Sequence, residues 1–189
     1  MSGWLQGWQD ATTGASADSP FDYVDLDSAV DFVLLQELAK NNDAYFLSVH
    51  IWKDVGGLIH FTPWDLDLSF GQPLYHDSTN PEGWIVYRPA MIAAMAARPE
   101  FQARLVERWT ELRAGLMSDA SISASIDFHL ETLAPWIDAN FERWPIDQIQ
   151  FLDNQLYPVS SYDQEVGLVR AWITTRLAWM DAHIAEYGG

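Results

Sequence analysis

The sequence predicts an α+β domain that is mainly α, with one β-hairpin followed by a bundle of four to five helices. Three observations support this fold class. A length of 189 residues suits one domain with a real hydrophobic core. Apolar residues recur at spacings of three and four through most of the second half, which is the period of an amphipathic helix. A single pair of runs rich in aromatic and β-branched residues flanks a glycine turn, which is typical of one hairpin.

Composition narrows the class of protein. Apolar residues make up 49% of the chain, so it is not a disordered acidic tail. The formal charge of -17 at pH 7 disfavours nucleic acid and anionic membranes as partners and favours cations such as Mg²⁺ or Ca²⁺. The absence of cysteine excludes disulfides and thiolate zinc sites. No apolar run reaches the roughly 20 residues that a membrane span needs, so no membrane partner is expected.

The N-terminal part is predicted to be a flexible segment over residues 1–21, because it is rich in Gly, Ser, Thr and Asp. It contains no basic region followed by an apolar stretch, so no signal peptide is recognised. A first helix is predicted over residues 25–42, capped at Asp25 or Asp27.

A hairpin is predicted over residues 45–62, with strands at 45–53 and 58–62 around the turn DVGG. After a loop rich in Pro, Gly and Asn, the chain is predicted to be helical to its end. The expected helices cover residues 89–98, 99–118, 119–144 and the stretch from Ser160 or Ser161 onward, where Gln164 is placed for a capping box on Ser161. The helix at 119–144 carries apolar residues at helical spacing, namely Ile122, Ile126, Leu130, Leu133 and Ile137.

Two aspartates, Asp65 and Asp67, lie two residues apart in the apolar stretch FTPWDLDLSFG. A buried carboxylate is costly unless it is paired or binds a cation. A third aspartate, Asp43, follows the first helix, so the predicted hairpin sets the separation between Asp43 and the pair. Phosphoryl transfer needs one carboxylate to orient the acceptor hydroxyl and another to hold the metal on the phosphates. Asp43 is the candidate for the first role, and Asp65 or Asp67 for the second.

The stretch LLQELAKNNDAYFLSVHIWKDVGGLIHFTPWDLDLSFG resembles the CotH family, kinase-like proteins first described in bacterial spore coats. The likeness continues through ARPEFQARLVERWTELRAGLMS, NFERWP and EVGLVRAWITTRLAWMDAHI, and so covers nearly everything from about residue 22 onward. The resemblance implies an atypical kinase that binds ATP and Mg²⁺ and phosphorylates serine or threonine on a partner protein. Some relatives lie on spores or cell surfaces or are secreted, which leaves the compartment of this chain unknown.

The resemblance also implies roles for individual residues. Asp43 matches the catalytic aspartate, Asp65 the metal-binding aspartate, and Asp67 a second metal ligand. Asn42 and Ser48 are the expected cofactor-binding residues. Ser48 stands where the family often has an asparagine for a second metal, and Asn41 or Asn42 are the alternatives for that role.

The resemblance further implies that residues 22–189 are the C-terminal lobe of the family domain, with the N-terminal lobe absent. No glycine-rich phosphate loop precedes Asp43, and the only lysines, Lys40 and Lys53, lie on the first helix and at the hairpin turn. We expect upstream sequence to supply that lobe, and this chain by itself to be incomplete as an enzyme.

Other functions remain open at this point. The first alternative is a non-catalytic helical interaction module or a structural module of a surface or spore coat. A glycosidase with paired carboxylates suits the ten tryptophans but not the order of the elements. Taken alone, the Asp65–Asp67 pair is equally typical of a turn cap, His50 and His60 suit structural roles, and His76 and Asp77 lie in a loop that could face the nucleotide.

Overall fold

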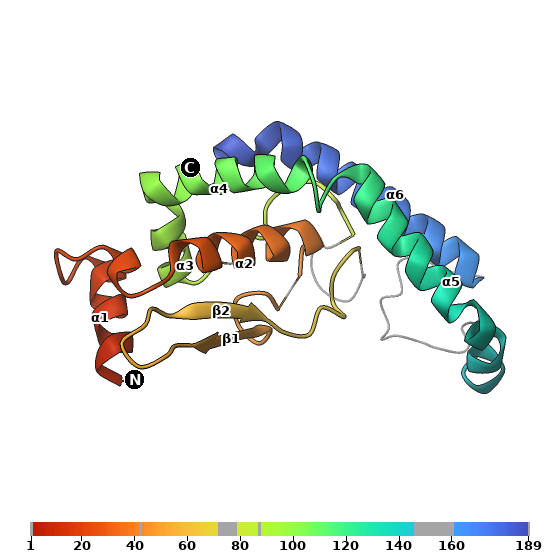
Figure 1. Ribbon diagram of the computed structural model, residues 1–189, viewed down its shortest axis with the longest axis horizontal. Coiled ribbons are helices and arrows are strands. Elements are labelled where there is room, and N and C mark those ends of the chain that lie inside the picture. Colours follow the sequence, from red (N-terminus) through yellow and green to blue (C-terminus); the bar gives the residue numbers. More distant parts are fainter. Residues whose placement is uncertain (1, 42, 72–78, 87, 146–160, 189) are drawn as a thin grey trace.

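The computed structural model describes residues 2–41, 43–71, 79–86, 88–145 and 161–188. Within these residues the fold is mainly helical, with one antiparallel pair of strands followed by several helices, which confirms the predicted fold class (Figure 1). The elements are α1 (Ser2–Thr13), η1 (Pro20–Asp22), α2 (Leu26–Ala39), β1 (Val49–Trp52), β2 (His60–Pro63), α3 (Ala90–Ala96), α4 (Pro99–Arg113), α5 (Asp119–Arg143), α6 (Tyr162–His183) and η3 (Ile184–Glu186).

Helix α2 is the centre of the fold, and α4, β2 and α6 pack around it. It begins at the cap Asp25, whose carboxylate accepts a hydrogen bond from the amide of Ser28 at 2.8 Å. Most of its residues are buried, including the polar Gln36 and Glu37. Its C-terminal cap, Lys40, adopts a left-handed conformation with φ 47°. The exposed residues of the helix lie in its first half, so the polar side chains buried in its second half must bond to protein groups, because water cannot reach them.

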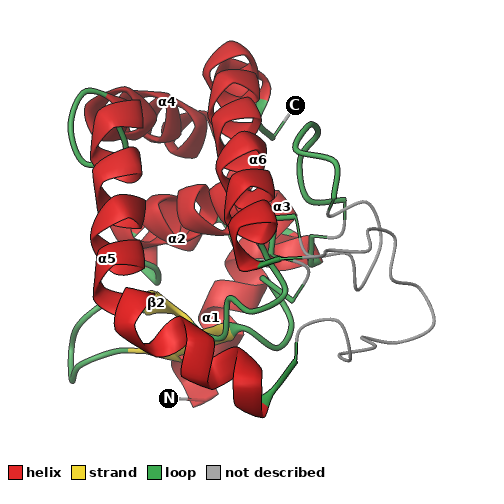
Figure 2. Ribbon diagram, turned by 90° about the vertical axis from the view of Figure 1, so that its right-hand side faces the viewer, coloured by secondary structure: helices red, strands yellow, loops and turns green. Residues whose placement is uncertain are grey.

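The hairpin is shorter than the sequence predicts. Strands β1 and β2 pair from Val49 opposite Pro63 to Trp52 opposite His60. One side of the hairpin faces the core through Phe61, which stacks on Phe32 with ring centroids 5.2 Å apart. The other side is open, and Figure 2 shows from a second view how small the strand content is beside the helices. The expected first strand begins late because residues 43–47 form a turn instead.

The N-terminal segment differs from the prediction of flexibility, because residues 2–13 form α1. Trp8 and Ala11 of this helix are buried, and the indole of Trp8 meets Phe61 edge-on at 5.8 Å. The indole nitrogen of Trp4 donates a hydrogen bond to the carbonyl of Tyr23 at 2.9 Å. The helical signal is the apolar spacing of Trp4, Leu5, Trp8 and Ala11, which the Gly and Ser content masks.

Helix α5 has the predicted bounds, but its apolar face is not part of the main core. None of its residues is buried, although Ile122 and Ile126 pack partly against the core. Leu133, one of the apolar residues at helical spacing, is 50% exposed. The reason is tertiary: α5 and the first half of α6 extend away from the layers formed by α2, α4 and the hairpin (Figure 1). An ion pair between Arg170 and Asp127 joins these two helices.

The second half of α6 returns to α2 through a buried ion pair, Arg176 with Glu37, both fully buried. The guanidinium of Arg176 donates to the carbonyl of Glu37 at 2.7 and 3.0 Å, and to the carbonyls of Pro81 and Gly83 at 2.8 and 2.6 Å. The Glu37 carboxylate accepts from the amide of Ile85 at 2.9 Å. Burial raises the pKa of Glu37 and lowers the pKa of Arg176 to about 10, so desolvation outweighs their attraction. Arg176 therefore still carries its charge at neutral pH.

Replacing Arg176 with methionine is expected to destabilise the fold by about 3–5 kcal/mol, because it removes the buried cation beside Glu37 and the donor that bonds the carbonyl oxygens of Pro81 and Gly83. The matched control is Arg170→Met, which removes a partly exposed ion pair and should cost about 0–1 kcal/mol. Urea unfolding at neutral pH measures both free energies. Equal losses in the two variants would contradict the importance of the buried pair.

Candidate functional site

Asp43 lies in the turn between α2 and β1, and its side chain is half-buried. Its backbone carbonyl accepts hydrogen bonds from the amides of Phe46, Leu47 and Ser48 at 3.1, 3.1 and 3.0 Å. Its own amide donates to the side-chain oxygen of Asn41 at 3.1 Å. Five consecutive turn residues are thereby held around one carbonyl, which fixes the backbone of Asp43 without using its carboxylate.

Asp65 and Asp67 lie just after β2, and both are exposed. The chain is anchored immediately before them, where the amide of Trp64 donates to the carbonyl of Ser48 at 3.1 Å. Asp65 has φ 52°, a left-handed conformation that non-glycine residues rarely adopt. Such backbone strain is held only where surrounding contacts impose it, and it clusters at functional sites.

The loop after Asp67 returns to α2 and α6. The amide of Phe70 donates to the carbonyl of Ala39, the last residue of α2, at 2.8 Å. Gly71 has φ 91°, and a Cβ there would lie 2.8 Å from the indole of Trp172. Only glycine fits this position without displacing the indole or straining the backbone. The loop that carries Asp65 and Asp67 is thus anchored at both ends.

The three carboxylates interact electrostatically. The pKa of Asp65 is raised, first by the charge of Asp67, then by partial desolvation, by a side-chain hydrogen bond with Asp67 and by the charge of Asp43. The amide nitrogen of Asn41 also reaches the backbone carbonyl of Asp65 at 3.5 Å. The structure therefore brings Asp43 and Asp65 to the same end of the hairpin, although 22 positions separate them in the sequence (65 minus 43).

The donor chemistry of this group suits Mg²⁺. Carboxylate oxygens are its preferred protein ligands, and it is typically held by one or two carboxylates, with water and phosphate completing the shell. Mutual repulsion that raises the pKa of Asp65 is the kind of cost that a divalent cation relieves. Within the described residues, no set of three or more His, Cys, Asp or Glu side chains forms a closed metal cage.

The remaining predicted residues have different surroundings. Ser48 is buried, and its backbone carbonyl accepts hydrogen bonds from the amide of Trp64 and from the side chain of Gln36. Asn41, an alternative for the second metal, is fully buried and already bonded to Gln36, Asp43 and Asp65. Asn42, and the loop pair at positions 76 and 77, lie outside the described residues.

Both lysines are engaged in the structure. The ammonium of Lys40 donates to the carbonyls of Asn80 and Glu82, each at 2.6 Å. The ammonium of Lys53 donates to the carbonyl of Asp54 at 2.9 Å and lies 4.6 Å from the ring centroid of Trp4. Lys40 therefore acts with Arg176 in fastening the 79–85 segment to α2.

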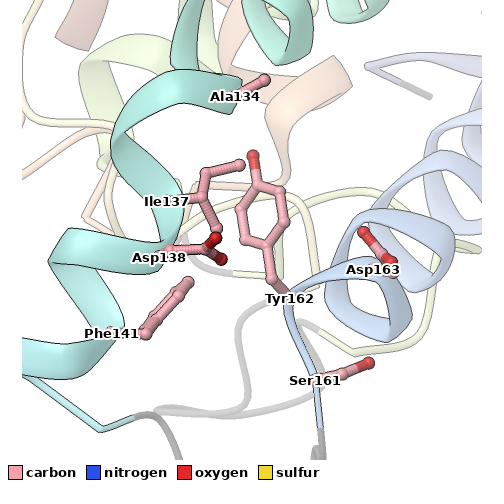
Figure 3. Close-up of a pocket in the computed structure, with 7 residues that line it drawn as sticks. All are labelled: Ala134, Ile137, Asp138, Phe141, Ser161, Tyr162 and Asp163. Atoms are coloured by element: carbon pink, nitrogen blue, oxygen red, sulfur yellow. The ribbon is translucent and has the colours of Figure 1, made fainter.

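A hollow in the surface lies between the C-terminal half of α5 and the start of α6, far in the sequence from the three aspartates. Figure 3 shows its lining, in which the ring of Tyr162 points between the two helices and Asp138 and Phe141 lie beside it. Tyr162 and Phe141 form an aromatic contact with centroids 5.9 Å apart. None of the predicted site residues lines this hollow.

Sequence reasoning missed the polar groups that support the site. Gln36, Glu37 and Lys40 act from the last turns of α2, and Arg176 acts from α6. The readable signal was the presence of Gln36 and Glu37 among the apolar residues of a helix, which indicates buried polar contacts. Their partners were not readable, because the bonded residues are far apart in the sequence.

A mainly helical domain that sets loop carboxylates at the end of a β-hairpin is the arrangement expected of a kinase-like lobe. The sequence profile of the family described as CotH kinase protein matches residues 11–180. The chain belongs to this family, which confirms the resemblance read from the sequence. Membership of a kinase family implies use of a nucleotide and suggests protein substrates. No curated protein matches the chain. None of the helices in the described part is long and apolar enough to span a bilayer.

Replacing Asp67 with asparagine is expected to return the pKa of Asp65 toward its ordinary value and to raise the thermal unfolding midpoint at neutral pH. An acid whose pKa is raised by folding contributes stability at low pH that is lost as the pH rises through the folded pKa. The increase in the unfolding midpoint of Asp67→Asn over the wild type should therefore vanish at pH values below the ordinary pKa of 3.8, where these carboxyls are protonated in both the folded and the unfolded state.

Thermal melts followed by circular dichroism at neutral and acidic pH test this prediction. Asp138→Asn on α5 is the control, because it removes the same net charge away from the site. An equal gain in the two variants would show that overall charge, not the Asp65–Asp67 contact, is responsible.

Proposed function

We propose that this chain provides the catalytic carboxylates of an atypical protein kinase, which transfers the γ-phosphoryl group of ATP to serine or threonine on a partner protein. The observation that carries the proposal is the convergence of Asp43 and Asp65 at one end of the hairpin, within a chain of the CotH kinase protein family. Phosphoryl transfer depends mainly on positioning and electrostatics, and two fixed carboxylates at a hairpin supply both.

In this mechanism Asp43 orients the acceptor hydroxyl and accepts its proton. The hydroxyl oxygen bonds to the γ-phosphorus as the bond from that phosphorus to the bridging oxygen breaks, and ADP leaves. Asp65 and Asp67 would hold Mg²⁺, which neutralises charge on the phosphates when bound. The left-handed backbone of Asp65 sets its carboxylate beside that of Asp67, and the turn around the carbonyl of Asp43 leaves its half-buried side chain to meet the acceptor.

The proposed mechanism also requires phosphate-binding groups from outside the described residues. The two lysines of the chain are held by backbone carbonyls, and the formal charge is -17. A net negative field repels a nucleotide triphosphate, so a bound cation has to supply most of the attraction. We propose, as the sequence predicts, that an N-terminal lobe contributes the remaining phosphate-binding groups.

The 189-residue chain by itself is therefore expected to bind Mg-ATP weakly, with a dissociation constant of about 1 mM or higher, which is about 4 kcal/mol of binding free energy. Isothermal titration calorimetry with ATP at saturating Mg²⁺ measures this affinity. Micromolar binding by the chain alone would contradict the need for further phosphate contacts.

In a protein extended to include an N-terminal lobe, Asp65→Asn and Asp43→Asn are expected to separate metal binding from transfer. Asp65→Asn should weaken Mn²⁺ or Mg²⁺ binding and lower transfer together, because it removes a ligand. Asp43→Asn should lower transfer while largely keeping metal binding, because it acts on the acceptor. The loss of transfer in each should be on the order of 10²-fold or more.

Calorimetry with Mn²⁺, and transfer of labelled γ-phosphate to a serine-containing acceptor protein, provide the two measurements. Asp67→Asn should be milder if Asp67 is a second ligand. If Asp65→Asn keeps normal transfer activity and Asp67→Asn has none, Asp67 is the main metal ligand and Asp65 the second. Full activity in both Asp43→Asn and Asp65→Asn would exclude the mechanism.

A second candidate function is a helical interaction module, favoured by the projecting α5. This helix has no buried residue and exposes Phe128, Leu133 and Trp136 at 64%, 50% and 69%. Exposed apolar side chains in such number on one helix are typical of contact surfaces. The two functions are compatible, since α5 lies apart from the aspartates.

A further inference from the structure

We propose that the buried amides of Gln36 and Asn41 are positioning residues that hold the turn carrying Asp43 against the loop carrying Asp65. Both side chains are fully buried, one in the last turn of α2 and the other immediately after the end of the helix. A buried primary amide is costly unless its donors and acceptor are bonded. The bonds that these two amides make therefore define which segments must stay in place.

The two amides bond to each other, with the nitrogen of Asn41 3.0 Å from the oxygen of Gln36. Their remaining groups reach three backbone points. The oxygen of Asn41 accepts from the amide of Asp43 at 3.1 Å, and its nitrogen donates to the carbonyl of Asp65 at 3.5 Å. The nitrogen of Gln36 donates to the carbonyl of Ser48 at 3.4 Å.

At these three backbone groups the turn that carries Asp43, the start of β1 and the loop that carries Asp65 are held together. The carbonyl of Ser48 at the entry to β1 also accepts from the amide of Trp64 at the exit of β2, at 3.1 Å. Gln36 thus binds the same carbonyl of Ser48 at which the two strands meet, and Asn41 binds Asp43 before the hairpin and Asp65 after it. The separation of Asp43 and Asp65 is consequently set at the backbone by neutral buried amides.

The same contacts account for the strained backbone of Asp65. A φ of 52° at a non-glycine residue persists only when its neighbours impose it. The bond from Asn41 to the Asp65 carbonyl and the bond from Trp64 to Ser48 lie on either side of this residue. Loss of the Asn41 amide should let Asp65 relax and move its carboxylate away from Asp43.

Amide hydrogen exchange by NMR tests the positioning directly and does not depend on any activity. In Asn41→Ala the amide of Asp43 should exchange at least about tenfold faster, a change of about 1.4 kcal/mol in local protection. Leu105→Val, in the buried core of α4, is the control for general destabilisation. The exchange of amides in α4 should change no more in Asn41→Ala than in this control.

Gln36→Met keeps the size of the side chain and removes its hydrogen bonds. It should speed exchange of the Trp64 amide, because that amide and Gln36 bond to the same carbonyl of Ser48. This variant tests the proposal if Asn41→Ala does not fold. Unchanged protection of Asp43 in Asn41→Ala and of Trp64 in Gln36→Met, relative to Leu105→Val, would overturn the proposal.

The consequence for metal binding rests on the proposed function and is measured separately, by calorimetry with Mn²⁺. If the wild type binds Mn²⁺, Asn41→Ala should weaken binding by about tenfold with Leu105→Val unchanged, as expected of a residue that acts through Asp43 and Asp65. Full affinity in Asn41→Ala would overturn this consequence. Absence of binding in the wild type would count against the proposed function, while the exchange measurements still decide whether the two amides position the site.

Discussion

The burial of the C-terminal half of α2 is the constraint on which the rest of the structure depends. The polar side chains buried there cannot bond to water, so each of them must bond to another segment. The carboxylate of Glu37 accepts hydrogen bonds from the amide of Ile85 and from Arg176. The side chain of Gln36 donates to the carbonyl of Ser48 at the start of the hairpin. The last turns of this one helix thus organise the hairpin, α6 and the loop at 79–85 around a common point.

This arrangement divides two tasks between two kinds of polar group. The charged residues Glu37, Lys40 and Arg176 fasten the large elements, and their charges are buried or bonded to carbonyls. The neutral amides of Gln36 and Asn41 lie between those charges and the aspartates. Because these amides are neutral, they do not offset the negative charges of the carboxylates in the site. Those charges, first that of Asp67, raise the pKa of Asp65. A site of this kind favours cations, in agreement with the acidic composition of the chain.

Much of the fold and part of the site could be read from the sequence. The apolar period located α2, α4, α5 and α6 to within a few residues, and Asp25, Ser118 and Ser161 cap three of these helices. The spacing of the aspartates around a hairpin predicted the candidate site, and the family profile matches residues 11–180, which include all three aspartates. Helix α1 was missed because Gly and Ser content outweighed a short apolar pattern, and the first strand was overextended because a turn around the Asp43 carbonyl replaces its beginning.

Local pattern by itself therefore determined most of the elements, their order and the family, since each of these depends on neighbouring residues in the chain. It also supplied the prediction that Asp43, Asp65 and Asp67 form the site. The tertiary structure decided which apolar face is buried, as α5 demonstrates, and which polar residues support the site. Arg176 reaches α2 from 139 positions away, and Asn41 reaches Asp65 from 24 positions away. Such contacts are set by how the helices and hairpin pack in space, and no period or local propensity in the sequence encodes them.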